Sequence, residues 1–129
     1  MNKRLRVLCV DDEPGVAELI GLILQPQNVQ VEGATSGQEA LETMRHDPPD
    51  VVMLDIMMPE MDGWEVYHQM RADFRLKKIP VIVVTARNNS FEEIIARERA
   101  GVNDYVTKPF VPNDVRQSLA KVVDLETGD

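Results

Sequence analysis

The sequence predicts an α/β protein with a doubly wound parallel sheet and helices on both of its faces. The two most apolar stretches, residues 51–54 and 81–84, are continuous hydrophobic runs bounded by turn residues. Such runs are typical of strands that are buried on both faces. Strand-like segments also alternate five times with segments of helical spacing, and this alternation is typical of a parallel sheet with covering helices.

The first half of the chain contains two predicted strands and two predicted helices. Residues 5–10 form a short apolar strand that runs into consecutive acids. Pro14 suits the first turn of a helix, and Pro26 stops that helix. Residues 29–32 alternate apolar and polar side chains, which indicates a more exposed strand near the sheet edge. Residues 36–39 form a capping box for a second helix, which ends before a pair of prolines.

The middle of the chain holds the two most buried strands. Residues 51–55 form the third strand, followed by a loop and by apolar residues at helical spacing over 64–70. We expect that third helix to end near residues 74–76. Residues 81–85 then form a fourth strand, which is also buried on both faces.

The last part of the chain completes the pattern with two helices around a short strand. Apolar residues over 91–100 predict a fourth helix with Gly101 as its C-terminal cap. Residues 104–107 form the fifth strand. Pro112 can begin the last helix, whose apolar positions continue to residue 123. Each predicted helix follows a predicted strand, so the chain is five βα units in one domain.

Charged and polar side chains stand where the predicted strands end. Asp11 and Asp12 follow the first strand, Asp55 ends the third, Thr85 ends the fourth and Lys108 follows the fifth. Because the carboxyl ends of parallel strands share one edge of the sheet, we expect these side chains to converge. Three carboxylates repel one another and need a cation to stay ionised, and Mg²⁺ prefers such oxygen ligands. A carboxylate can also attack phosphorus to form an aspartyl phosphate, with charge stabilisation from the other groups.

The chain resembles the receiver domains of two-component response regulators over essentially its whole length. The resemblance rests on four stretches at strand ends, which are Val10-Asp11-Asp12-Glu13, Leu54 to Pro59 with Met61-Asp62-Gly63, Thr85-Ala86, and Asp104 to Phe110. It implies a flavodoxin-like fold of three α/β/α layers, with five helices and strand order 2-1-3-4-5. It also implies one receiver domain over residues 1–129, with a core of about residues 5–124.

The resemblance assigns the acids to phosphotransfer. It implies that Asp55 accepts a phosphoryl group from a sensor histidine kinase or a phosphotransfer protein. Asp12 and Asp55 would be direct Mg²⁺ ligands, with the Met57 backbone carbonyl as a third ligand and Asp11 acting mainly through water. The domain would thus be a self-phosphorylating signalling module rather than an enzyme that turns over a metabolite.

The resemblance also assigns a switch. Lys108 would contact the phosphoryl group, and its bond to Pro109 would be cis. Thr85 would move toward the phosphate, and Tyr105 would turn inward as it does. The surface of the fourth helix, fifth strand and fifth helix would then control an effector domain or protein. Ser118 stands where one dimeric class of regulators carries arginine, so that particular dimer is not expected, while another phosphorylation-dependent homodimer stays open.

Two other classes compete with this hypothesis. An Mg²⁺-dependent phosphohydrolase with an aspartate nucleophile usually has a second aspartate two residues later, where this chain has Met57. A flavodoxin-like cofactor binder would need a loop rich in Gly, Ser or Thr after the first strand. The acids at 11–13 would repel a phosphate there unless a metal intervened.

Two positions beside the expected site bear on the lifetime of a phosphoryl group. The Met57 side chain cannot orient a water molecule for attack on an acyl phosphate, and Arg87 would partly cover that phosphate. We therefore predict ordinary to slow self-dephosphorylation.

Composition limits the surroundings in which the protein works. The net charge of -8 argues against direct contact with nucleic acid. No apolar stretch approaches the roughly 18 residues of a membrane span. Cys9 is the single cysteine and is expected to be a small core residue, so there is no disulfide framework. These features favour a cytoplasmic protein with no membrane contact.

Overall fold

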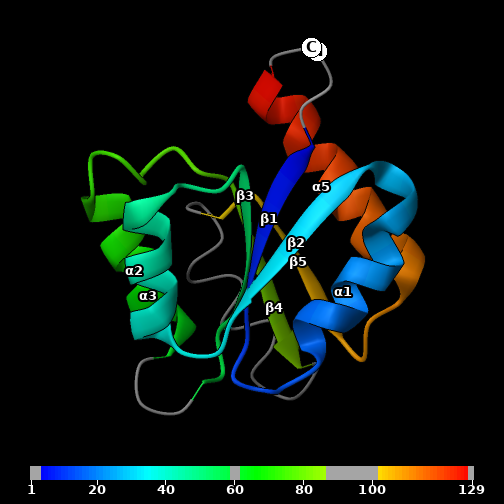
Figure 1. Ribbon diagram of the computed structural model, residues 1–129, viewed down its shortest axis with the longest axis horizontal. Coiled ribbons are helices and arrows are strands. Elements are labelled where there is room, and N and C mark those ends of the chain that lie inside the picture. Colours follow the sequence, from blue (N-terminus) through cyan, green and yellow to red (C-terminus); the bar gives the residue numbers. More distant parts are fainter. Residues whose placement is uncertain (1–3, 59–61, 87–101, 128–129) are drawn as a thin grey trace.

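A five-stranded parallel sheet forms the centre of the computed structural model, which describes residues 4–58, 62–86 and 102–127 (Figure 1). The strands are β1 (Leu5–Val10), β2 (Val29–Ala34), β3 (Val51–Asp55), β4 (Val81–Ala86) and β5 (Asp104–Lys108). Their order is β2-β1-β3-β4-β5, and all four pairings are parallel. The predicted sheet type and strand order are therefore confirmed.

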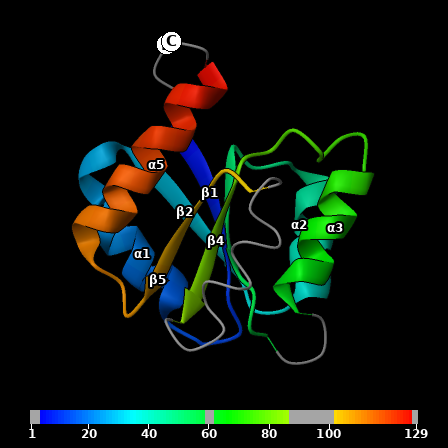
Figure 2. The same ribbon diagram turned by 180° about the vertical axis from the view of Figure 1, so that it is seen from behind.

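Helices cover both faces of the sheet. The helices α1 (Val16–Leu24) and α5 (Pro112–Thr127) lie on one face, and α2 (Gly37–His46) and α3 (Gly63–Ala72) lie on the other (Figures 1 and 2). The described residues contain four of the five predicted helices. The predicted fourth helix, at 91–100, and its Gly101 cap lie outside the described residues. None of the described helices is both long and apolar enough to span a bilayer.

The period of two along a strand divides the core between the two helical layers. Leu8 and Val10 pack into the cluster under α2 and α3, whereas Val7 and Cys9 pack into the cluster under α1 and α5. Because both faces are covered, every residue of β3 is buried, while the edge strand β2 is partly exposed. Cys9 is a buried core residue as predicted. Burial, together with the charge of nearby Asp11, raises the pKa of its thiol to about 12, so the thiol stays uncharged at neutral pH.

Two helix boundaries differ from the sequence prediction. The helix α1 begins at Val16 rather than in the turn of Pro14, because Gly15 intervenes with a left-handed φ of 92° that favours glycine. The helix α3 ends at Ala72, earlier than the predicted 74–76. Asp73 has an extended backbone there and starts a turn toward β4, which ends the helix before residues 74–76.

The predicted capping box of α2 is formed only in part. The Ser36 side chain accepts the Glu39 backbone N–H at 3.1 Å, as in a capping box. The Glu39 carboxylate, however, accepts the backbone N–H of Thr35 at 2.8 Å instead of that of Ser36. The box therefore reaches one residue further back and fixes the end of β2 against the helix.

Candidate functional site

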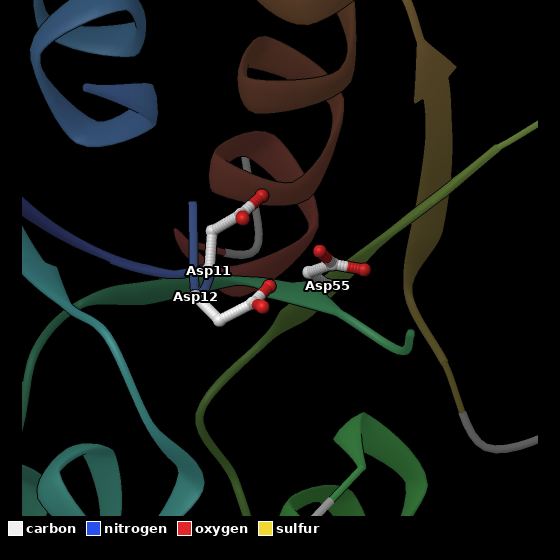
Figure 3. Close-up of side chains that lie close together, drawn as sticks. All are labelled: Asp11, Asp12 and Asp55. Carbon is white, nitrogen blue, oxygen red and sulfur yellow. The ribbon is translucent and has the colours of Figure 1, made fainter. Parts of the chain in front are cut away.

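Three carboxylates gather where β1 and β3 end. The two strands are paired with Val10 opposite Leu54, so Asp11 and Asp12 leave β1 beside Asp55, the last residue of β3. One oxygen from each carboxylate lies within 4.8 Å of the other two (Figure 3). Asp11 and Asp55 are buried, while Asp12 is exposed. The structure thus brings together the acids that the sequence placed at one edge of the sheet.

Lys108 extends from the end of β5 into this acidic cluster. Its Nζ lies 2.7 Å from Asp11 Oδ2, 3.1 Å from Glu13 Oε1 and 3.4 Å from Asp55 Oδ2. Burial by itself would lower the pKa of the ammonium, but the close contacts with Asp11 and Glu13 and the charge of Asp55 raise it above the ordinary value. The side chain therefore stays charged. Its peptide bond to Pro109 is cis, as the resemblance implied.

The backbone and Lys108 orient the Asp55 carboxylate from two sides. Its Oδ1 accepts the Met57 backbone N–H at 2.8 Å, while Oδ2 faces the Lys108 ammonium. Burial raises the pKa of Asp55, and the Asp11 charge adds to the rise, whereas the Met57 N–H and Lys108 act against it. The ionised form is thus held in place but is less favoured than in water.

The cluster fits a hard divalent cation. Its donors are carboxylate oxygens, which Mg²⁺ and similar ions prefer, and they lie close enough to share one ion. Asp11 Oδ2 is buried, and its contact with Lys108 is an ion pair without the geometry of a regular hydrogen bond. Asp12 opens the cluster to solvent. The Met57 backbone adjoins the acids through its bond to Asp55, so its carbonyl belongs to the same loop as the expected ligands.

A close approach by Gly63 brings α3 against the end of β3. The Gly63 N–H donates to the Ile56 carbonyl at 3.3 Å. A Cβ at residue 63 would overlap the Asp55 carbonyl oxygen and the Ile56 Cα. Only glycine lets the helix begin there. Asp62 caps α3 by accepting the Glu65 N–H at 3.0 Å, so the loop after Asp55 is fixed at its far end.

The remaining predicted residues, Thr85 and Tyr105, lie on β4 and β5 but outside the described contacts of the cluster. Thr85 is buried near the end of β4, one residue beyond the partner of Asp55, and its Oγ1 lies 3.4 Å from the Ala86 carbonyl. Tyr105 lies nearer the start of β5, opposite Val83, and is exposed. Sequence reasoning assigned no role to Glu13, which contacts Lys108. The sequence feature that could have indicated this contact is the position of Glu13 directly after Asp11 and Asp12.

Comparison with known proteins shows the family of this chain. The family model of the response regulator receiver domain matches residues 7–120. The chain belongs to this family. The receiver domain is 34% identical over 123 residues to the alkaline phosphatase synthesis transcriptional regulatory protein PhoP of Bacillus subtilis, a match that covers 95% of the chain and 49% of PhoP. It is 42% identical over 118 residues to the response regulator MprA of Mycobacterium leprae, covering 92% of the chain and 49% of MprA.

Solved structures resemble the receiver domain along most of its length. The chemotaxis response regulator CheY4 of Vibrio cholerae is 28% identical and superposes with a TM-score of 0.81, over 93% of this chain and 99% of that one. The N-terminal domain of a response regulator receiver protein from Methanoculleus marisnigri is 32% identical, with a TM-score of 0.73 over 93% and 94%. The chain spans about half the length of the curated relatives it matches. These relatives are signalling regulators, so the phosphohydrolase alternative is not favoured.

Proposed function

We propose that the receiver domain accepts a phosphoryl group on Asp55 from the phosphohistidine of a sensor histidine kinase or of a phosphotransfer protein. An Asp55 oxygen attacks phosphorus, the P–N bond of the donor breaks, and the leaving imidazole nitrogen takes up a proton. The observation that carries the proposal is the cluster of Asp11, Asp12 and Asp55, with oxygens within 4.8 Å, together with the Lys108 ammonium 3.4 Å from Asp55.

The same residues would hold Mg²⁺. Asp12, Asp55 and the Met57 carbonyl are the proposed direct ligands, and Asp11 would act through water. When bound, Mg²⁺ would neutralise charge on the phosphoryl oxygens. The residues of the chain would position the Asp55 carboxylate. The Met57 N–H holds Asp55 Oδ1 in position, and burial of Asp55 leaves its carboxylate little contact with bulk water.

Lys108 has a second part in the proposal. Its ammonium now lies among Asp11, Glu13 and Asp55 and offsets their mutual repulsion. A phosphoryl group on Asp55 would offer it a stronger charge-assisted partner. Lys108 would then turn toward the phosphoryl oxygens and leave Asp11 to the cation.

The proposed output is a change of surface near β5. Thr85 would move toward the phosphoryl group and Tyr105 would turn inward, which would alter the face formed by β5 and α5 together with residues outside the described part of the chain. This face would control an effector or a phosphorylation-dependent homodimer. PhoP is named a transcriptional regulatory protein, so a DNA-binding effector is one candidate, and the receiver domain itself would make no nucleic-acid contact.

Intact mass measured after incubation with acetyl phosphate tests the proposal. We expect one phosphoryl adduct on the wild type that requires Mg²⁺. Asp55→Asn removes the attacking oxygen and should abolish the adduct. Asp114→Asn, which changes an exposed acid on α5 in the same way, should leave it intact.

Two outcomes would contradict the proposal. An adduct that persists in Asp55→Asn would place the phosphoryl group elsewhere. A folded wild type that binds Mg²⁺ but forms no adduct would mean that the domain signals by binding alone.

A further inference from the structure

Basic residues concentrate at the end of the sheet opposite Asp55. The chain has 14 lysines and arginines against 22 acids, yet residues 71–78 contain four of the basic residues, Arg71, Arg75, Lys77 and Lys78, and one acid. This segment ends α3 and runs to β4 along the amino-terminal edge of the sheet (Figures 1 and 2). The concentration therefore stands out against an acidic molecule.

The turn that carries these charges is well braced. Leu76 is completely buried and anchors it to the core. Arg71 Nη1 donates to the carbonyls of Lys77 and Ile79 at 2.8 and 3.0 Å. The Asp73 carbonyl accepts the backbone N–H groups of Leu76 and Lys77 at 3.0 and 2.9 Å. The turn therefore presents its outward side chains in a fixed arrangement.

Phe74 is the most exposed large hydrophobic residue in the described part of the chain. Its side chain is 84% exposed, and the Lys77 ammonium lies 5.0 Å from the centre of its ring. An exposed aromatic ring on a braced turn leaves apolar area in water that a partner could cover. Aromatic residues and arginine are enriched in protein interfaces.

A pocket of about 280 Å³ lies beside the turn. Leu5, Ile79 and Val123 give it an apolar floor, and Arg75 and Lys78 stand at its rim. Asp50 also lines it, but one of its carboxylate oxygens already accepts the Arg6 N–H at 2.8 Å. Within residues 4–58, 62–86 and 102–123, no side-chain hydrogen bond or ion pair engages Arg75 or Lys78. Two cations thus face a pocket that could take one apolar side chain.

We propose that Phe74, Arg75, Lys77, Lys78 and this pocket form a docking surface for an acidic segment of a partner protein. Carboxylates of the segment would pair with the cations, and one apolar side chain of the segment would enter the pocket beside Phe74. The apolar floor favours a peptide over a nucleic-acid backbone, which would bring charge alone. The surface lies away from Asp55, so a segment bound there would leave the phosphorylation site open.

The test uses a fluorescein-labelled heptapeptide with six acidic residues and a central leucine, measured by fluorescence anisotropy in about 50 mM salt. A matched peptide has asparagine in place of the leucine. The variant Phe74→Ser/Lys78→Glu should weaken binding of the leucine peptide by about tenfold or more, as expected for loss of an anchor and a charge pair. Both positions lie in the turn outside helices and strands, and thermal unfolding of the variant checks that it folds.

Lys121→Glu is the matched control, because it makes the same change of charge at a lysine on α5 that is 61% exposed. It should change binding by less than about twofold. Chemical shifts of the wild type should change at residues 74–80 and 49–51 on adding the peptide. Equal binding of both peptides, equal loss in Lys121→Glu, or shifts confined to other residues would overturn the proposal. The proposal would also be overturned if the wild type bound duplex DNA or vesicles of anionic lipid more tightly than the leucine peptide, and if the Phe74→Ser/Lys78→Glu change abolished that binding.

Discussion

Charged groups are arranged differently at the two ends of the parallel sheet. At the amino-terminal end, charged groups bond to the backbone, and the ion pairs of Arg6 are made with exposed acids, Glu32 and Asp47. Arg71 donates to two carbonyls, and the Arg6 backbone N–H donates to Asp50 while its guanidinium donates to the Pro48 carbonyl at 3.0 Å. These bonds connect the loops before β3 and β4 to β1 and α3.

At the carboxyl-terminal end, charged groups face one another instead. Asp11 and Asp55 are each 4% exposed, and with Asp12 they depend on one ammonium and two backbone N–H groups. Like charges crowded in this way oppose folding until a cation enters. The amino-terminal end of the sheet therefore stabilises the fold, whereas the crowded carboxylates of the proposed phosphorylation site lower the stability at the other end. Substitutions at the two ends should therefore separate stability from phosphorylation.

Gly63→Ala should have the largest effect and should damage both properties. Its Cβ would overlap the backbone of Asp55 and Ile56, so α3 must shift away from the end of β3. We expect a loss of about 3 kcal/mol in the free energy of unfolding, as for severe overpacking. We also expect phosphorylation by acetyl phosphate to slow by about tenfold or more, because Asp55 moves with its backbone. Urea unfolding and intact mass measure the two effects.

Gly21→Ala is the matched control. It lies within α1, where a Cβ would meet only the Val31 Cβ at an ordinary 3.8 Å. Alanine favours a helix interior, so stability should rise by about 0.5–1 kcal/mol with no change in phosphorylation. Equal losses in both variants would show that the close approach at Gly63 is not the cause.

Arg71→Ala tests the amino-terminal end. The variant loses the bonds to the Lys77 and Ile79 carbonyls and the stacking of the guanidinium on Tyr67, whose ring centre is 4.8 Å away. Urea unfolding should show a loss of about 2 kcal/mol, while the rate of phosphorylation stays within about twofold. Arg45→Ala, which removes a more exposed arginine paired with Asp73 at 3.4 Å, should cost about 0.5 kcal/mol or less. A large fall in phosphorylation in Arg71→Ala would contradict the separation of the two ends.

The sheet and the acidic cluster were predictable from the sequence because both follow from periodicity and strand direction. The buried runs at 51–54 and 81–84 had few alternatives to parallel strands. Once the sheet is parallel, Asp11, Asp12, Asp55 and Lys108 must meet at one edge. Their convergence therefore needed no knowledge of side-chain packing.

Features that depend on close packing were not predictable in the same way. The sequence marked Gly63 as the end of a loop, but its contact with the β3 backbone depends on how α3 sits against the sheet. Gly15 has a left-handed backbone, so α1 begins only after it. Pro14 did not reveal this, because proline is equally compatible with a helix that begins one residue earlier. Glu13 reaches Lys108 across 95 residues of sequence, and a row of three acids does not show which of them faces the lysine.

Asp55→Asn should stabilise the protein in the absence of Mg²⁺, while abolishing phosphorylation. The amide removes a buried negative charge beside Asp11 and keeps the shape of the side chain. We expect a gain on the order of 1 kcal/mol at neutral pH, the usual size for a single polar substitution. Thermal unfolding with and without Mg²⁺ measures it, and Mg²⁺ should raise the wild-type midpoint more than that of the variant.

The stability gained in Asp55→Asn should be larger at high pH than at low pH. Burial raises the pKa of Asp55 in the folded state above its value in the unfolded chain. The folded state therefore binds this proton more tightly, and the stability that the proton contributes is present below the unfolded pKa and is lost as pH rises through the folded pKa. The free energy of unfolding of the wild type, taken relative to that of Asp55→Asn, should be lower at about pH 7.5 than at about pH 4. A difference that stays constant with pH would argue against the raised pKa.

Met57→Asn should have the smallest effect, confined to the lifetime of the phosphoryl group. The Met57 side chain is 60% exposed, so the exchange should leave stability within about 0.5 kcal/mol. An amide two residues after Asp55 could orient a water molecule for attack on the acyl phosphate, which methionine cannot do. We expect dephosphorylation to quicken by about threefold, less than 1 kcal/mol on the barrier, measured as decay of the intact-mass adduct after acetyl phosphate is removed. Met57→Leu, which adds no polar group, should decay at the wild-type rate. A wild-type adduct that already decays within seconds would mean that another residue orients the water, and would contradict the predicted ordinary to slow self-dephosphorylation.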